Sequence, residues 1–229
     1  MTESRSRLGF LVAEAVLIVV SILLAFAIDA AWDGREEARE RAELLSAMRA
    51  DFAATAVNLD RAIEHGEAVA ARTGGYLRAV RAGSDIRRDS LETLFGGVDD
   101  VAFFEPTVAS YRTALSTGSI ELARSPELIS ALNEFDFAEG LYRLHLGVSA
   151  DLYYLGPLQD LRREGVVFDD TEVGEDGVSV PPGFDLFSAL ATSAAEPIYT
   201  VQVNMLRNLQ GMRTAADRVL AALDALLVG

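Results

Sequence analysis

Side chains able to carry out chemistry are few, and their spacing matches no metal-binding or catalytic motif. The two histidines, His65 and His145, fall in different predicted helices. Neither belongs to a histidine pair four residues apart or to an HExxH motif, the arrangements that bind zinc on a helix. The chain has no cysteine, which removes disulfides, thiolate catalysis and cysteine-ligated metals together. We therefore expect surface or half-buried histidines, and neither a metal nor another cofactor.

Carboxylates gather in the stretch GVDDVAFFEP, where Asp99, Asp100 and Glu105 lie close in sequence to two phenylalanines. Paired carboxylates can exchange protons with a substrate. At a loop position in a helical protein, however, helix capping and packing are the more frequent roles of such residues. The stretch is therefore only a weak indication of acid–base catalysis.

Two further stretches are similar to functional motifs in composition alone. The acidic run DDTEVGEDG (169–177) has Thr171 and Val173 where a calcium-binding EF-hand loop needs oxygen ligands after Asp169. The run STGS (116–119) lacks the strand–turn–helix context of a serine nucleophile and fits the end of a helix. We therefore predict that the protein is not an enzyme and that the acidic run is a solvated loop.

The strongest structural signal is an apolar run near the N-terminus. Residues 15–28 contain no charge, and Ser21 is their only polar side chain. A helix over residues 8–28 is about 31 Å long, close to the hydrocarbon thickness of a bilayer. Ten Leu, Ile, Val and Phe residues in 16–28 favour insertion by roughly 3 to 6 kcal/mol, which exceeds the cost of Glu14. We predict a short tail over residues 1–7 and a transmembrane anchor over residues 8–33.

Two other interpretations of this run compete with the anchor. The start SRSR and the small residues AFA (25–27) fit a cleaved signal peptide, but its apolar part would be too long and would contain a glutamate. A buried core helix would need a polar stripe, and the run is apolar on all faces. The anchor is the interpretation that accounts for both the length and the all-round apolar character.

Polar residues mark the two rims of the predicted anchor. Trp32 fits the interfacial belt, where indole rings lie at headgroup level. Glu14 and Trp32 are about 27 Å apart in a helix, again close to the hydrocarbon thickness. Glu14 and Asp29 then either lie at the membrane surfaces or pair with a basic group or hydroxyl of a partner helix. The candidate membrane or partner contacts are Glu14, Ser21, Asp29 and Trp32.

Amphipathic periodicity predicts a long helix that continues from the anchor. Apolar residues step by three or four positions from Leu45 to Ile63, opposite a face of Glu and Arg. Gly66, Gly74 and Gly75 interrupt the pattern, and we expect the helix to bend or weaken there.

Two more long amphipathic helices are predicted in the second half. Ser125 and Pro126 fit the N-cap and first turn of one of them, with a kink expected at Gly156–Pro157. The last helix is expected to open at Pro197 and to continue to the C-terminus. Long helices of this kind stabilise each other by burying their apolar stripes together.

The predicted fold class is therefore all-α, an N-terminal transmembrane helix followed by an antiparallel helical bundle over residues 34–229. An acidic loop is expected at about 166–184, where periodicity is lost, and no strand-period segment of useful length occurs.

The net charge of −15 disfavours nucleic acid as a partner. Aromatic residues concentrate in FDFAEGLYRLHL and DLYYLGPL on the second long helix. Core packing explains most of them, and any left exposed would form a docking surface.

Two stretches together resemble a family. EAVLIVVSILLAFAIDAAWD with LLSAMRADF, and FFEPTVASYRTALSTGSIELARSPELISAL, are similar to an uncharacterised bacterial family of single-pass membrane proteins of unknown function. The resemblance covers about residues 10–135, although the asparagines usual before the tryptophan are here Asp29 and two alanines. It implies an architecture and no activity. The positions that match the family pattern are Phe104, Pro106, Tyr111, Leu115, Ser116, Gly118, Glu127 and Leu128.

Arginines give no clear orientation, since some precede the predicted anchor and others follow it. The resemblance implies a bacterial inner membrane, with the N-terminus cytoplasmic and the C-terminal domain periplasmic. We expect a non-enzymatic accessory subunit that docks onto and stabilises a larger membrane protein complex, such as a respiratory or photosynthetic assembly. Its partners would be the lipid bilayer and other membrane protein subunits. The alternative is an extracytoplasmic ligand-binding or sensor bundle that works with a separate signalling partner.

Overall fold

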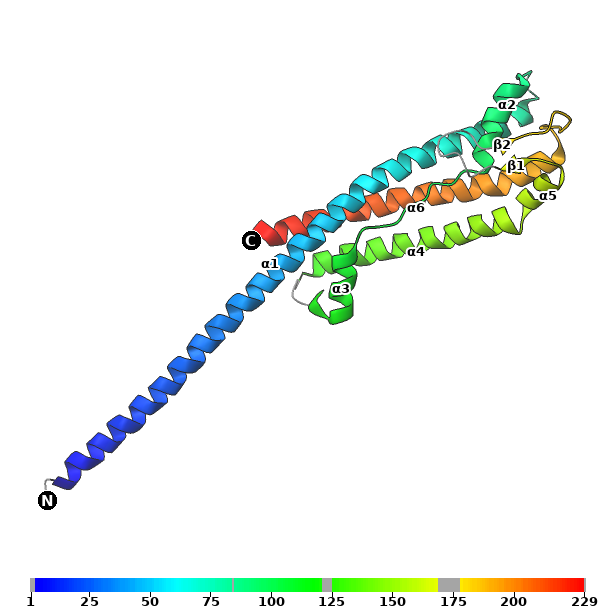
Figure 1. The fold of residues 1–229 in the computed structure, drawn as a ribbon. Coiled ribbons are helices and arrows are strands. Elements are labelled where there is room, and N and C mark those ends of the chain that lie inside the picture. Colours follow the sequence, from blue (N-terminus) through cyan, green and yellow to red (C-terminus); the bar gives the residue numbers. More distant parts are fainter. Residues whose placement is uncertain (1–2, 84, 121–124, 169–177, 229) are drawn as a thin grey trace.

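The computed structural model shows one very long helix with a helical bundle built along its second half (Figure 1). Residues 3–83, 85–120, 125–168 and 178–228 are described, apart from the side chains of 3–16 and 18. The helices are α1 (Glu3–Ala82), α2 (Arg88–Phe95), the 3₁₀ turn η1 (Gly96–Val98), α3 (Ala109–Thr117), α4 (Pro126–Tyr154), α5 (Pro157–Arg163) and α6 (Ala189–Val228). The two-residue strands β1 (Val167–Phe168) and β2 (Val178–Ser179) pair antiparallel. The all-α class predicted for the bundle is confirmed.

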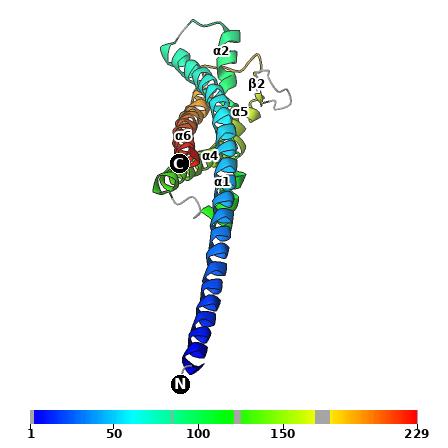
Figure 2. The same cartoon turned by 90° about the vertical axis from the view of Figure 1, so that its left-hand side faces the viewer.

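Helix α6 packs against both α1 and α4 and runs antiparallel to each of them (Figures 1 and 2). The register is visible in ion pairs that join distant parts of the chain. Arg49 of α1 pairs with Asp224 near the end of α6, and Arg218 of α6 pairs with Glu134 near the start of α4. Since α1 and α4 point the same way, the chain must return between them, and segment 99–108 makes this return.

Two apolar clusters form the interior of the bundle. In the larger one, Phe52 of α1 packs edge-on against Phe135 of α4, with ring centroids 5.1 Å apart, and lies 6.2 Å from the ring of Tyr111 in α3. In the smaller one, at the far end of the bundle, Tyr76 of α1 packs edge-on against Phe95 of α2. Because α6 contributes buried residues to both clusters, it ties the two ends of the bundle together.

Helix α1 continues without interruption through the three glycines at which a bend or weakening was expected. Two of these glycines allow close packing instead. A Cβ on Gly74 would lie 2.9 Å from Cε2 of Tyr199, and one on Gly75 would lie 3.0 Å from Cδ2 of Leu94. The glycines therefore let α6 and α2 approach α1, which is a tertiary constraint that a single-helix pattern does not reveal.

The prediction that Pro197 opens the last helix is wrong, because α6 begins at Ala189 and Pro197 lies inside it. A proline inside a helix removes one backbone hydrogen bond. Here the turns before it are fixed by burial of Ala191, Ala194 and Ala195, all of which are fully buried. The hydroxyl of Ser188 also accepts a hydrogen bond from the amide of Ala191, at 3.2 Å. Packing and capping together outweigh the proline.

The predicted loop at 166–184 holds β1 and β2 at its edges. Its acidic run 169–177, including Asp169, Thr171 and Val173, lies outside the described residues. Two predictions about the ends of α4 are confirmed. Ser125 caps α4 by accepting a hydrogen bond from the amide of Leu128, and the chain breaks between α4 and α5 at residues 155–156.

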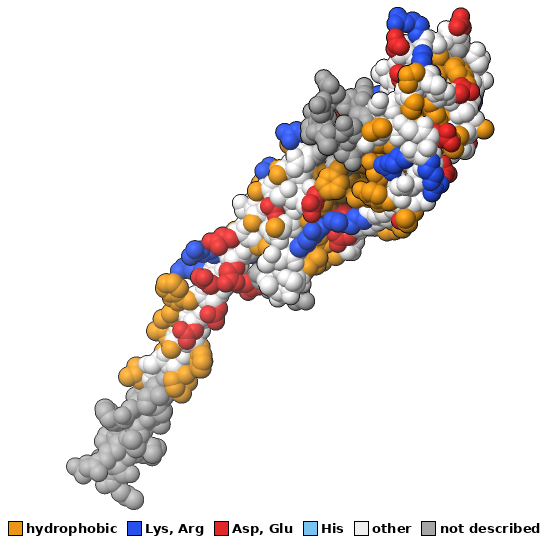
Figure 3. Space-filling view, turned by 45° about the vertical axis from the view of Figure 1, so that its right-hand side comes forward, with side chains coloured by type: hydrophobic (Ala, Val, Ile, Leu, Met, Phe, Trp, Pro, Cys, Tyr) orange, Lys and Arg blue, Asp and Glu red, His pale blue; other side chains and the backbone are white. Residues whose placement is uncertain are grey.

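In the first half of α1 the chain runs as a single helix that extends beyond the bundle (Figures 1 and 2). Figure 3 shows apolar side chains along the described part of this projection, followed by charged ones closer to the bundle. Among the residues that the structure describes, no helix combines the length and the apolar character needed to cross a membrane. The side chains of 3–16 and 18, which belong to the predicted anchor, lie outside that part.

Alkaline pH should destabilise the bundle through Tyr76. Its hydroxyl is buried and donates a hydrogen bond to the carbonyl oxygen of Leu186 at 2.7 Å. Burial raises the pKa of Tyr76 from 10.0 to about 12. The folded state thus favours the neutral phenol, so its stabilisation is complete below pH 10 and is lost as pH rises toward 12. Its share is on the order of 2–3 kcal/mol.

Urea unfolding at pH 9 and pH 11.5 measures this loss. Tyr76→Phe lacks the ionisable group, so its free energy of unfolding should fall less over the same interval. Some alkaline sensitivity should remain, because burial also raises the pKa values of Tyr111 and Tyr142. An equal fall in both proteins would show that Tyr76 does not carry the effect.

Candidate functional site

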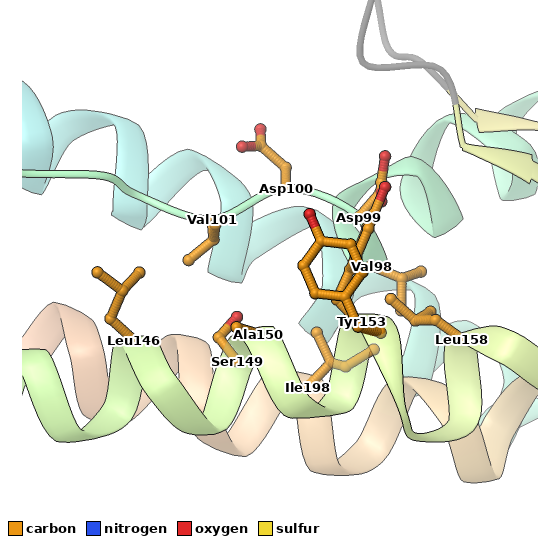
Figure 4. A pocket seen from close by; sticks show the side chains of 11 residues that line it. Val98, Asp99, Asp100, Val101, Leu146, Ser149, Ala150, Tyr153, Leu158 and Ile198 are labelled. Carbon is orange, nitrogen blue, oxygen red and sulfur yellow. The ribbon is translucent and has the colours of Figure 1, made fainter.

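Segment 99–108, which we call the strap, lies between α1 and α4 (Figure 4). Its side chains alternate between the interior and the solvent, as in a β-strand, although it pairs with no described strand. The buried set is Ala102, Phe104, Pro106 and Val108, and the exposed set is Phe103, Glu105 and Thr107. The strap thus takes the place of a fourth bundle member without being helical.

Side chains of α1 and α4 supply the hydrogen bonds that an extended backbone cannot make alone. The hydroxyl of Tyr142 donates to the carbonyl of Ala102 at 2.9 Å and accepts from the amide of Phe104 at 2.7 Å. The hydroxyl of Thr55 donates to the carbonyl of Thr107 at 2.9 Å and accepts from its amide at 3.0 Å. One hydroxyl on each side therefore fixes the strap's depth and register.

A buried amide and a salt bridge hold the start of the strap. The side-chain nitrogen of Gln202 in α6 donates to the carbonyls of Gly97 and Asp100, at 2.7 and 2.9 Å. The carboxylate of Asp100 pairs with Arg72 at 2.7 Å and with Nε2 of His65 at 2.9 Å. Asp100 therefore acts as an anchoring group between the strap and α1.

A cavity of about 260 Å³ lies below the start of the strap, between it and α4 (Figure 4). Its lining is largely apolar and comes from η1, the strap, α4, α5 and α6. The polar members are Asp99, Asp100, Ser149, Tyr153 and Tyr154. The ring of Tyr153 is stacked by the guanidinium of Arg162, 4.2 Å from the ring centroid. The cavity could hold a small, mainly apolar molecule.

The acidic stretch does not assemble as a catalytic pair. Asp99 and Asp100 line the cavity, but Asp100 is held by Arg72 and His65, while Glu105 is exposed farther along the strap. Both of these partners belong to α1, so the Asp100 carboxylate is engaged in joining the strap to that helix. The geometry therefore favours a structural role for these acids.

The two histidines have separate partners. His65 contacts Asp100, whereas Nδ1 of His145 lies 2.8 Å from the carbonyl oxygen of Leu141 and 2.9 Å from Nδ2 of Asn208. Within the described residues no group of three His, Asp or Glu side chains is arranged to hold a metal ion.

The residues that match the family pattern lie along the strap, α3 and the start of α4. The hydroxyl of Tyr111 donates to Asp136 at 2.6 Å, which joins α3 to α4. Gly118 adopts a left-handed conformation, φ 77°, and ends α3. Leu115 is exposed, whereas three members of the set are buried: Phe104, Pro106 and Leu128. The hydroxyl of Ser116 donates to the carbonyl oxygen of Thr113. The carboxylate of Glu127 accepts a hydrogen bond from the hydroxyl of Ser125. This set shapes the turn from the strap to α4.

A charged network reinforces the same junction, and only part of it could be expected from the sequence. Glu139 of α4 is buried and pairs with Arg112 of α3 at 2.8 Å and with Arg143 one turn further along α4 at 2.7 Å. Two arginines balance the desolvation of one carboxylate. Burial, together with the hydrogen bond to Asp136, raises the pKa of Tyr111. Spacing within α4 predicts only the Glu139–Arg143 pair.

The candidate membrane contacts lie on the projecting part of α1. Asp29 is exposed, Trp32 is 66 % exposed, and the hydroxyl of Ser21 donates to the carbonyl of Leu17. The side chain of Glu14 lies outside the described residues. Large apolar side chains between residues 17 and 28 are 49 to 67 % exposed: Leu17, Val19, Val20, Ile22, Leu23, Leu24, Phe26 and Ile28. No described part of the bundle covers them.

We found no match for the chain among family profiles, curated proteins or solved structures. The resemblance to a family of single-pass membrane proteins therefore stays a prediction, and the function has to be inferred from the residues themselves.

Proposed function

We propose that the protein is a non-enzymatic, membrane-anchored subunit that docks onto and stabilises a larger membrane protein complex. The observation that carries this proposal is the exposed apolar surface of α1 between residues 17 and 28. Contiguous apolar surface of this kind needs lipid or protein to cover it. The charge-free run 15–28 extends that surface toward the N-terminus in the sequence.

The anchor of this proposal spans residues 8–33, with the N-terminus cytoplasmic and the bundle periplasmic in a bacterial inner membrane. Trp32 then lies at the outer surface, and Asp29 lies about one turn inside it. At that depth Asp29 pairs with a basic group or hydroxyl of a partner helix. The bundle provides a stiff domain outside the membrane, because α1 is continuous from the projecting part into the bundle.

The anchor is tested with two arginines placed in the apolar run. Leu23→Arg with Leu24→Arg should move the chain from the membrane pellet to the alkaline-extractable fraction, because arginine is strongly disfavoured in the hydrocarbon region. The matched control is Val57→Arg with Val228→Arg, which places the same charges on exposed apolar positions of the bundle. If wild type, the Leu23→Arg, Leu24→Arg variant and the control all pelleted in equal amounts, the predicted anchor would be contradicted.

Docking is tested on the same membranes after gentle solubilisation. On a native gel the wild-type chain should migrate with other polypeptides, in a band larger than the chain alone. Recovery of the intact chain solely as a free monomer would contradict the proposed docking function without contradicting the predicted anchor.

A second candidate function is supported by the cavity below the strap. An extracytoplasmic bundle that binds a small apolar ligand there would work with a separate signalling partner. Thermal melts of the full chain across a panel of small metabolites address this candidate, and a flat response would count against it.

A further inference from the structure

The outer face of α4 carries apolar side chains that no other described element covers. We define this face by the residues at three- and four-residue spacing, which share one side of a helix. Phe137 and Leu144 are 70 and 62 % exposed, and Val148 and Leu155 are also exposed. Between them lie Gly140 and Gly147. The face extends over about five turns.

Neither glycine is required for close packing against a described part of the chain. A Cβ on Gly140 or on Gly147 would meet no atom within 4 Å. Glycine weakens a helix interior relative to alanine. Elsewhere in the protein the helical glycines Gly66, Gly74 and Gly75 have neighbours at this distance. On the outer face of α4, each glycine instead presents no side chain next to a large apolar one, and we call these two positions the pits.

Acidic residues lie at the start of the apolar face and near its end. Asp136 precedes Phe137, and Asp151 lies one turn beyond Gly147 and Val148. Both are exposed, and no ion pair to either acid is found among the described residues, although Asp136 accepts the hydrogen bond of Tyr111. Within the face, Arg143 is balanced by Glu139. The two acids are fifteen residues apart, which is about 22 Å along the helix.

We propose that this face binds an amphipathic helix of a partner protein. The partner helix carries large apolar side chains seven residues apart, which enter the pits at Gly140 and Gly147. It also carries basic side chains, which pair with Asp136 and Asp151. Opposite charges at the rim of an interface direct association and fix its register. A second copy of the chain is disfavoured as the occupant, since it would bring two chains of net charge −15 and two sets of rim acids together. The inference rests on the proposed docking function and gives the chemistry of the partner.

The test uses the full chain in zwitterionic nanodiscs, or in buffer if the chain does not insert, so failure of the anchor does not prevent it. The probe is an alanine-based helical peptide with leucines seven residues apart and lysines fifteen residues apart. A matched peptide carries glutamates in place of the lysines. We expect the lysine peptide to bind about tenfold more tightly, and its binding to weaken with added salt.

The decisive variant is Gly140→Leu with Gly147→Leu, which fills both pits without changing any charge. It should weaken binding of the lysine peptide about tenfold or more. The chain should still fold, because leucine is a better helix former than glycine and both sites are open. Circular dichroism melts check this. The control is Gly34→Leu, at a helical site equally free of neighbours.

Each outcome decides the inference. Equal binding of the lysine peptide to the variant and to wild type would overturn it, because charge attraction alone would then account for binding. Equal binding of the two peptides would overturn the basic chemistry of the partner. Self-association of wild type that the variant loses, seen by sedimentation, would assign the face to a second copy and overturn the proposed occupant.

Discussion

Replacing Phe52 with alanine should lower the free energy of unfolding by about 3–5 kcal/mol. Phe52 is fully buried and its ring contacts Phe135 of α4 and Tyr111 of α3, so one truncation removes packing between three elements. The cavity left behind is bounded by α1, α3 and α4, whose positions are fixed by α6 on one side and the strap on the other. Closing around the gap would shift α1 and α4, which hold the strap through the hydrogen bonds of Thr55 and Tyr142.

Urea or guanidinium unfolding of the full chain measures the loss. Phe137→Ala is the matched control, because the same atoms are removed from a ring that is mostly in solvent. That variant should change stability by less than about 0.5 kcal/mol. Similar losses in the two variants would mean that burial of Phe52 is not what holds α1, α3 and α4 together.

The apolar stripe of α1 could be predicted because its period repeats within one helix. Leu45, Met48, Phe52 and Leu59 were expected on a single face, and all four are buried. A helix packed on one side leaves this signal in the sequence even when its partners are unknown. The long helix and the all-α class follow from the same signal, whereas the bend or weakening expected at the three glycines does not occur.

The strap was missed because its burial depends on residues far away in the chain. The alternation of Ala102, Phe104 and Pro106 with exposed neighbours is present in the sequence, but the adjacent Phe103 and the proline obscure it. Its hydrogen bonds come from Thr55 and Tyr142, which lie about 40 to 50 residues away. Neither residue belongs to a recognisable motif. Local pattern therefore could not show that an extended segment completes the bundle.

The outer face of α4 was only partly predictable. Aromatic residues were expected to concentrate on this helix, and any that were not buried were expected to form a docking surface. Phe135 is fully buried and Phe137, two residues later, is mostly exposed. Because α4 is apolar on both sides, periodicity could not distinguish the two rings. The distinction comes from the position of α6, which covers one side of α4 only.

Replacing Gly97 with alanine should lower the free energy of unfolding by about 1–3 kcal/mol, and more if the backbone cannot shift. The added Cβ would lie 2.7 Å from the hydroxyl oxygen of Thr73, 2.9 Å from Cβ of Arg72 and 2.9 Å from the backbone nitrogen of Thr73. The backbone nitrogen of Thr73 and the Cβ of Arg72 cannot move independently of the α1 backbone. Either α1 or η1 must therefore shift. The matched change Gly140→Ala meets no atom and should stabilise the chain by about 0.5–1 kcal/mol.

The same substitution should loosen the strap, because the carbonyl of Gly97 accepts a hydrogen bond from Gln202, which also holds the carbonyl of Asp100. Moving η1 away from α1 therefore weakens both bonds at the start of the strap. The Phe104 amide donates a hydrogen bond to the hydroxyl of Tyr142, so its hydrogen exchange measures this loosening of the strap. Exchange there should be faster in Gly97→Ala and unchanged in Gly140→Ala. Unchanged exchange in Gly97→Ala, with stability lost, would mean that η1 and the strap move independently and that Tyr142 and Thr55 alone hold the segment between α1 and α4.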